Sequence, residues 1–436
     1  MSKSSTSSDS QSAPAAPRTD RREFLQRTAG ASLVAAAPLI LPSTVLGSGA
    51  TAPSNKITLA SIGVGSQGRY DIDRFLKLGD VQVVAVCDAD AHRLAAAKQR
   101  IDEHYGNTDC QTYRDFREVL ERDDIDTIHT ATPDHWHVPI AAAACAAGKD
   151  VYCQKPLSLT VREARRAVDS ARRFGRVFQV GTQNRSNPSA RYGCELVRNG
   201  RLGDLKSIDV GTWEVSKRCW LPEEPEPEHI DWNMWLGPAP YRPYHSELHR
   251  SRGWMPYMDY SGGGVTDFGA HFFDLVQWAM GTEDSGPVEI TPLDASQNGG
   301  RFVSYKYANG VTVYRVSGNY MKFVGSEGEL VLDICGWAKI KSVKPHTLDR
   351  EPIGPNEVHL RRSDNHYANF IECVRTRQKP AADVELGCRA VSICHIGNIA
   401  EWLGRPLKWD AKQEEFVDDA EANRWLDRPY REPWTV

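Results

Sequence analysis

The sequence predicts a two-domain α/β protein: an N-terminal Rossmann domain with a parallel sheet, then an α+β domain with an open, mostly antiparallel sheet and helices on one face. Three observations support this. Strands that are apolar on both faces alternate with helices as far as residue 182. A glycine turn joins the first strand to the first helix, and hairpin patterns dominate the second half. The length, 436 residues, also exceeds what one hydrophobic core normally organises.

Residues 1–50 are predicted to be a twin-arginine export signal and tail. Arg21-Arg22 precedes Phe24-Leu25, an apolar stretch and the small residues GSGA. The apolar stretch is shorter than the roughly 20 residues that a spanning helix needs. The alternative is a disordered Ser/Ala-rich tail with a chance arginine pair. We therefore expect a periplasmic or otherwise exported protein that is a partner of the twin-arginine export machinery, with cleavage near Ala50 or retention of the segment as an anchor.

Charge and cysteine content exclude some functions. The chain has 53 Lys and Arg against 57 Asp and Glu, a net charge of −4, which gives no basic surface for nucleic acid or an anionic membrane. No C-x-x-C pair occurs among the 10 cysteines, so no structural zinc site or other metal site is predicted. Several cysteines lie in apolar patterns, so we predict buried free thiols.

The first domain, residues 56–182, is predicted to be a series of βαβ units. Its strands are ITLASIGV, VQVVAVCD, IDTIHTATP, DVYCQKP and RVFQVGTQ, with helices at residues 91–104, at 114–122, after the fourth strand and after the fifth. We number IDTIHTATP as the fourth strand and DVYCQKP as the fifth, and assign no residues to the third. This alternation predicts a parallel sheet covered on both faces.

The second domain, residues 183–436, is predicted to bind substrate and to mediate oligomerisation. We expect a helix near residues 189–199, the strand KSIDVGTWE, and a Pro/Trp-rich loop over 218–260. A helix then begins after SGGG and ends at Gly281. Asn309-Gly310 predicts a hairpin, MKFVGSEGELVLD a second one, and residues 365–376 and 385–403 two helices.

The glycine turn predicts a dinucleotide site. Gly63, Gly65 and Gly68 form G-x-G-x-x-G, in which the glycines allow a tight turn, close approach of a pyrophosphate and helix packing. The helix amino end offers N–H groups to the phosphates. Asp88 ends the second strand, where a carboxylate binds ribose hydroxyls and repels a 2′-phosphate, so NAD is expected and NADP less so. The alternative is a nucleotide-free glycine turn.

Three side chains are predicted to be catalytic. Lys155 ends the fifth strand, at the edge where ligands of such sheets bind, and Pro156 fixes the turn that follows. Asp267 and His271 are four residues apart and share one helix face. Histidine suits the base that takes a hydroxyl proton, and a lysine ammonium stabilises an alkoxide. The alternatives are a helix N-cap for Asp267 and a core histidine for His271.

These motifs resemble the Gfo/Idh/MocA oxidoreductase family across residues 56–409. The resemblance rests on Lys155-Pro156, on the Asp267/His271 pair and on Thr132-Pro133 followed by His137; Gln154 stands where the family has glutamate. It implies that Lys155 contacts substrate and the nicotinamide ribose, and that the TPDHWH segment borders the cofactor. His135 and His137 would also suit a metal pair, but no third ligand is evident.

The candidate site residues fall into overlapping groups. The candidates for cofactor binding are Gly63, Gly65, Gln67, Gly68, Asp88, Thr132, Pro133, Trp136, His137, Lys155 and Gln183. The candidates for substrate binding are Lys155, Arg185, Trp213, Asp267 and His271.

A carbohydrate substrate is expected because six of the 12 tryptophans fall between Trp213 and Trp278, and aromatic faces pack on sugar rings. The alternative is that these aromatics pack in a core or subunit interface. The expected function is an NAD(P)-dependent oxidoreductase that acts on a sugar, glycoside or polyol hydroxyl with tightly bound cofactor. An NAD-assisted glycoside hydrolase and a non-catalytic sugar-binding relative remain alternatives. A homo-oligomer, dimer or tetramer, is expected.

Overall fold

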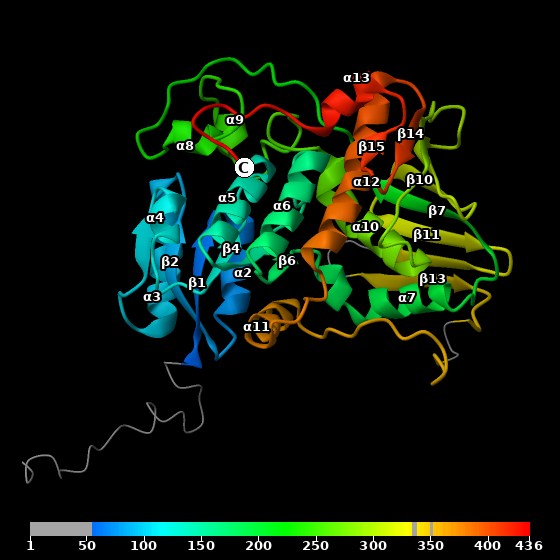
Figure 1. The fold of residues 1–436 in the computed structure, drawn as a ribbon, viewed down its shortest axis with the longest axis horizontal. Helices are drawn as coiled ribbons and strands as arrows, with labels where there is room; N and C mark the ends of the chain where they lie inside the picture. The colour runs from blue at the N-terminus through cyan, green and yellow to red at the C-terminus, as the bar shows by residue number, and fades with distance from the viewer. Residues whose placement is uncertain (1–54, 334–337, 349–351) are drawn as a thin grey trace, which may run out of the picture. The chain divides into compact units, whose positions relative to one another are not determined.

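A parallel six-stranded sheet forms the first half of the chain in the computed structural model, which describes residues 55–333, 338–348 and 352–436. The predicted export signal and Cys335 lie outside the described residues. The strand order is β3-β2-β1-β4-β5-β6, and every pairing is parallel (Figure 1). The strands are β1 Ile57–Ile62, β2 Val81–Cys87, β3 Gln111–Tyr113, β4 Thr127–Thr130, β5 Asp150–Cys153 and β6 Phe178–Val180. The order reverses between β1 and β4, and this is the switch point where such sheets bind ligands.

Helices cover both faces of this sheet, as predicted. They are α2 Ser66–Phe75, α3 Ala91–Tyr105, α4 Phe116–Leu120, α5 Asp134–Ala146 and α6 Val161–Arg173. Polar side chains begin several of them: Asp90, Asp115 and Thr160 each accept hydrogen bonds from backbone N–H groups of the first turn. By contrast α2 begins after Gly65 without a side-chain cap.

The second sheet has nine strands and is mostly antiparallel. Its order is β13-β12-β11-β7-β10-β9-β8-β14-β15. The strands are β7 Leu205–Thr212, β8 Glu289–Pro292, β9 Arg301–Lys306, β10 Thr312–Ser317, β11 Tyr320–Gly325, β12 Glu329–Asp333, β13 Lys339–Lys344, β14 Leu407–Asp410 and β15 Glu415–Phe416. The β9–β10 and β11–β12 hairpins confirm the predicted turns. β7 lies between β10 and β11 and pairs in parallel with β10, which local turn patterns do not reveal.

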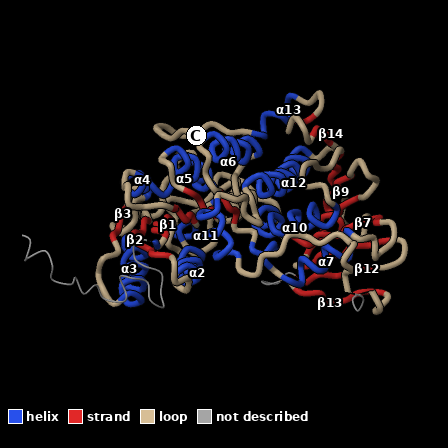
Figure 2. Tube along the Cα trace, turned by 60° about the horizontal axis from the view of Figure 1, so that its bottom comes forward, coloured by secondary structure: helices blue, strands red, loops and turns tan. Residues whose placement is uncertain are grey.

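The helices α7 Pro188–Arg198, α10 Gly264–Met280 and α12 Val384–Leu403 pack on one face of this sheet. Figures 1 and 2 both show α10 and α12 between the two sheets, with α6 against α12. The predicted glycine end of α10 is observed, since Gly281 caps it in the left-handed conformation at φ 72°.

The last part of the chain returns to the first domain. The helix α11 His366–Thr376 places Tyr367 and Phe370 in the same hydrophobic core as Phe75 and Tyr152. Val384 of α12 packs in the second hydrophobic cluster of the first domain, which also contains Phe178 and Val180. Residues 55–436 therefore form one compact unit, in which helices predicted for the second domain also complete the first.

Residues 218–260, here called the strap, cross from the second domain onto the first. The strap contains the short helices α8 Trp232–Leu236 and α9 Ser246–His249, which the sequence pattern did not predict. Asp90 and Ile230 form a β-bridge, and the indole of Trp136 donates to Met234 O at 3.0 Å. The C-terminal segment lies on the strap as well, since Arg431 Nε donates to Gly237 O at 3.0 Å.

The nine described cysteines are free thiols. Eight of them are buried, and Cys219 is half-buried. No helix within the described ranges has the length and apolar character needed to cross a membrane.

Candidate active site

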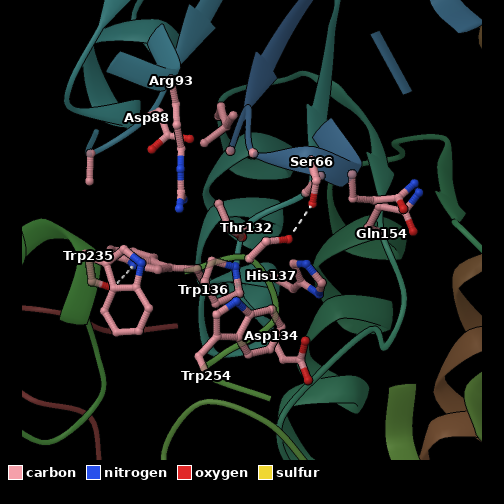
Figure 3. A pocket seen from close by; sticks show the side chains of 18 of the residues that line it. Ser66, Asp88, Arg93, Thr132, Asp134, Trp136, His137, Gln154, Trp235 and Trp254 are labelled. Atoms are coloured by element: carbon pink, nitrogen blue, oxygen red, sulfur yellow. Dashed lines mark hydrogen bonds between the residues drawn. The ribbon is translucent and has the colours of Figure 1, made fainter. Parts of the chain in front are cut away.

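A cavity of about 530 Å³ lies at the switch point of the parallel sheet and is roofed by the strap. Its walls come from the glycine turn, from Asp88, from the start of α5, and from Lys155, with Asp267 of α10 at one side. Figure 3 shows Asp88 and Arg93 together, with Trp136 and His137 further along the cavity. Of the predicted cofactor neighbours, Gly63, Gly65, Gln67, Asp88, Thr132, Pro133, Trp136, His137 and Lys155 line this cavity.

The glycine turn fits a dinucleotide. Gly63 has φ +81°, and a Cβ at this position would lie 2.7 Å from Thr132 N. Gly68 does not line the cavity, but a Cβ there would lie 2.0 Å from Gly63 O, so it provides the close helix–strand contact. Gly65 leaves the uncapped amino end of α2 facing the cavity, where it can bind a pyrophosphate.

Asp88 lies where a ribose would be held. Its Oδ2 accepts a hydrogen bond from Val64 N at 2.8 Å, and its Oδ1 accepts one from Asp90 N at 3.0 Å. Burial raises the pKa of this carboxyl, although Arg93 opposes the shift. Arg93 and Arg114 also line this end of the cavity.

Lys155 and Asp267 meet across the two domains. The ammonium of Lys155 donates to Asp267 O at 3.1 Å and pairs with Asp267 Oδ1, while Arg252 Nη2 donates to Oδ2 at 2.6 Å. Burial alone would raise the pKa of Asp267, but the two cations outweigh it and lower that pKa. Gly263 is the N-cap of α10, so Asp267 is held by these cations rather than acting as the cap.

Gln154 is held by the buried carboxyl of Asp71, which belongs to no recognisable sequence motif. Asp71 is fully buried on α2, and its Oδ2 accepts from Gln154 Nε2 at 2.7 Å and from His129 Nε2 at 3.0 Å. Its Oδ1 accepts from Gln67 Nε2 at 2.9 Å and from Tyr367 Oη at 2.6 Å. Gln154 Oε1 in turn accepts from Lys155 N at 3.2 Å. Asp71 thus anchors the residue that precedes the lysine.

His271 lies one helical turn after Asp267 and is half-buried rather than in the cavity lining. Burial, and then the neighbouring Lys155, lower the pKa of His271 to about 3, so the imidazole is neutral near pH 7 and able to accept a proton. No described residue hydrogen-bonds its Nδ1.

Two further groups border the lysine. His137 Nδ1 donates to Pro156 O at 2.7 Å and so fixes the turn after Lys155. Asp134 is 2% exposed, lines the cavity, and has a pKa raised well above its usual value, chiefly by burial. Asp134 lies inside the TPDHWH motif, but an acidic residue at a helix start is usually a capping residue, so the motif alone does not indicate a site role for it.

Three predicted residues lie elsewhere. The guanidinium of Arg185 is 4% exposed and pairs with Asp274 at 2.8 Å and Glu283 at 2.7 Å, so the expected substrate contact is replaced by a structural ion pair. Gln183 Nε2 lies 3.4 Å from Tyr152 Oη and does not line the cavity. Trp213 lines a second cavity, described below.

One group of three possible metal ligands occurs among the described residues: Asp90, His92 and His229, with ligand atoms within 4.8 Å of one another. The two imidazoles are stacked at 4.1 Å with 16° between their planes. Imidazole lone pairs lie in the ring plane, so two nearly parallel rings do not converge on one ion. Asp90 already caps α3 and lies 3.4 Å from Arg93, and we assign no metal to this group.

Comparison with known proteins agrees with this geometry. The model of the oxidoreductase family's NAD-binding Rossmann fold matches residues 57–182, and that of the oxidoreductase family's C-terminal alpha/beta domain matches residues 210–436; both models are those of Gfo/Idh/MocA proteins. The uncharacterized oxidoreductase YrbE of Bacillus subtilis is 25% identical over 230 residues, 53% of this chain and 55% of that protein. Glycosyl hydrolase family 109 protein 2 of Shewanella sp. (strain ANA-3) is 27% identical over 273 residues, 57% of each chain.

The chain therefore spans little more than half the length of these curated relatives. Among solved structures, the WlbA dehydrogenase from Bordetella pertussis in complex with NADH and UDP-GlcNAcA has a TM-score of 0.60 at 18% identity, covering 81% of this chain and 99% of that one. This likeness supports the fold.

Proposed function

The chain belongs to the Gfo/Idh/MocA oxidoreductase family, and on that premise we propose that it oxidises or reduces a sugar, glycoside or polyol with tightly held NAD. The observation that carries the proposal is the pairing of Lys155 with Asp267 in the cavity that also contains the glycine turn. The dinucleotide, when bound, supplies the hydride acceptor or donor.

The protein's own side chains orient the substrate and handle its proton. The ammonium of Lys155 stabilises the oxygen of the reacting hydroxyl as it loses its proton. Asp267, ionised because Lys155 and Arg252 lower its pKa, accepts a hydrogen bond from a neighbouring hydroxyl. His271, neutral because its pKa is lowered, is the proposed acceptor of this proton; since it lies outside the cavity lining, a water molecule would relay the proton to its ring. Such a role typically contributes about 10²–10⁴-fold in rate.

The strap supports retention of the cofactor. Ser251 Oγ lies 3.0 Å from Ser66 Oγ at the start of α2, and Arg93 Nη2 donates to His249 O at 2.5 Å. At the first residue of α3, Ala91 N donates to His229 O at 2.9 Å. A dinucleotide beneath the strap leaves only after such contacts break, so we propose that it stays bound between turnovers.

We propose NAD in preference to NADP because Asp88 faces the ribose position, and a carboxylate there repels a 2′-phosphate. The nearby Arg93 and Arg114 are the features that would favour NADP. Titration of the cofactor-free protein with NAD and with NADP distinguishes the two preferences.

An NAD-assisted glycoside hydrolase is the second candidate, favoured by the likeness to a glycosyl hydrolase family 109 protein. Transient oxidation of a sugar hydroxyl acidifies the neighbouring C–H, which permits loss of the leaving group. Addition of water and return of the hydride then give net hydrolysis. A sugar-binding relative without activity is the third candidate, and the Lys155–Asp267 pair argues against it.

We further propose that the protein is exported through the twin-arginine pathway, where folding before export would let it carry its cofactor, and that it is a homo-oligomer. One experiment tests the core proposal. The protein is purified from a host that exports it normally, denatured, and assayed for released NAD(H). About one dinucleotide per chain is expected, and a protein that releases none contradicts the proposal.

A further inference from the structure

A second cavity, of about 910 Å³, adjoins the first. Arg252 and Met255 of the strap line both cavities. Its other walls come from the residues after β7, from Gly264 at the start of α10, and from the ends of β10 and α12. The Arg252–Asp267 ion pair therefore stands between the proposed reaction centre and this second space. Its volume lies within the ~300–1,000 Å³ typical of small-molecule sites.

The second cavity contains an aromatic platform. The ring of Trp213 is packed on Phe268 of α10 with 4.4 Å between centroids, yet the residue stays 49% exposed. An indole that is half-exposed and held in place by a neighbouring ring offers a rigid apolar face on which a ligand ring can stack.

Two buried polar atoms of this cavity have no hydrogen-bond partner among the described residues: Ser216 Oγ and Arg315 Nε. Ser216 is 2% exposed and Arg315 is 3% exposed. The other groups of Arg315 are engaged, since Nη1 donates to Trp213 O at 3.3 Å and Nη2 pairs with Glu401. A buried polar atom without a protein partner is unfavourable, so each of these atoms is expected to meet water or a polar ligand.

From these observations we propose that the second cavity binds a further sugar unit of the substrate, beyond the unit that reacts at Lys155. An apolar ring face would stack on Trp213, while ring hydroxyls would satisfy Ser216 Oγ and Arg315 Nε. The inference rests on the proposed function and narrows it: the substrate is a disaccharide or larger glycoside rather than a free monosaccharide or an inositol.

The test compares matched sugars on the full-length protein as purified. Calorimetric titrations use glucose with cellobiose and maltose, galactose with β-1,4-galactobiose, and N-acetylglucosamine with chitobiose. At least one disaccharide is expected to bind about tenfold more tightly than its monosaccharide. If no disaccharide gains affinity over its monosaccharide, the proposal is overturned.

Three variants test which residues provide the gain in affinity of a disaccharide over its monosaccharide. Trp213→Ala should remove most of it and leave monosaccharide binding within about twofold, whereas Trp213→Phe should keep part of it. Ser216→Ala should weaken the disaccharide about two- to tenfold without lowering the melting temperature, because it deletes only an unpartnered hydroxyl. Trp220→Ala, at an 81% exposed tryptophan that lines neither cavity, is the matched control and should change nothing. Equal losses for both sugars in Trp213→Ala, or an intact gain in both Trp213→Ala and Ser216→Ala, would refute the assignment.

A parallel readout separates this proposal from the function beneath it. Fluorescence of the bound nicotinamide reports redox change upon sugar addition. If monosaccharides change it and disaccharides gain nothing, the oxidoreductase stands and the second subsite falls. If a Trp213-dependent gain occurs with no redox change for any sugar, the subsite stands and the proposed reaction falls.

Discussion

Replacing Asp71 by asparagine should destabilise the protein and disturb the lysine that this carboxyl supports through Gln154. The fully buried carboxyl accepts four hydrogen bonds, two on each oxygen. The carboxamide keeps one accepting oxygen and turns an NH₂ group toward the other two donors. Leaving two buried donors without an acceptor costs about 1–3 kcal/mol each, so a loss of about 2–6 kcal/mol is expected.

The assay is urea unfolding of the wild type, Asp71→Asn, Gln154→Glu and the double variant. In the wild type, Asp71 Oδ2 lies 2.7 Å from Gln154 Nε2, so Gln154→Glu alone places a second carboxyl beside that oxygen. One of the two acids then acquires a raised folded pKa, so this variant should lose stability as pH rises above about 4. The double variant restores a donor facing an acceptor and should recover more than half of the Asp71→Asn loss.

The reasoning is refuted if Asp71→Asn costs less than about 0.5 kcal/mol, or if the two substitutions are simply additive in the double variant. A second readout follows the lysine. Asp71→Asn should weaken dinucleotide binding and slow cofactor reduction, and the double variant should recover both, which loss of fold stability alone does not predict.

The remaining predictions concern the reacting groups. Lys155→Met should slow reduction of the bound cofactor by about 100-fold or more in single-turnover experiments, and unchanged rates would remove Lys155 from the site. The pKa of Asp267 in the folded protein is lowered, so its stabilising effect is present above about pH 4 and is lost as pH falls through the folded value. The difference in unfolding free energy between the wild type and Asp267→Asn should therefore shrink on acidification. A constant difference would contradict the ion pair. His271→Ala should lower turnover about 10²–10⁴-fold, and since the pKa of His271 is about 3, the wild type should show no loss of rate near pH 6.5 from this group. Asp88→Ser should raise affinity for NADP relative to NAD about tenfold in equilibrium titrations, and an unchanged ratio would mean that Asp88 does not set the preference.

The parallel sheet could be predicted because its signals are local. Strands apolar on both faces, a glycine turn and capping residues each specify a neighbouring element. Five of the six strands of the first domain occur where they were expected, whereas the short strand β3 was assigned no residues. Strand ends were less accurate, since IDTIHTATP yields only Thr127–Thr130, because the following Pro133 begins the turn into α5. The position of β7 could not be predicted, because pairing with β10 joins segments distant in the sequence.

The site divides in the same way. Lys155, Asp267 and the glycine turn belong to short motifs, and the structure brings them to one cavity. Asp71 belongs to no motif, and it acts through contacts across the fold, as in the Gln154–Asp71 hydrogen bond between residues 83 positions apart. Arg185 is a predicted substrate-binding residue, but its acidic partners Asp274 and Glu283 come from a distant helix and the loop after it. A sequence pattern does not reveal such pairing.

The most direct test of the proposed hydride transfer follows an isotope. The purified protein is incubated with a panel of fully C-deuterated sugars and disaccharides, then denatured, and the released dinucleotide is weighed by mass spectrometry. We predict that at least one sugar places deuterium on the nicotinamide in the wild type, and that Lys155→Met greatly reduces this transfer. Such labelling would occur in net redox and in NAD-assisted hydrolysis alike. Turnover of a sugar without any deuterium reaching the dinucleotide would contradict the account.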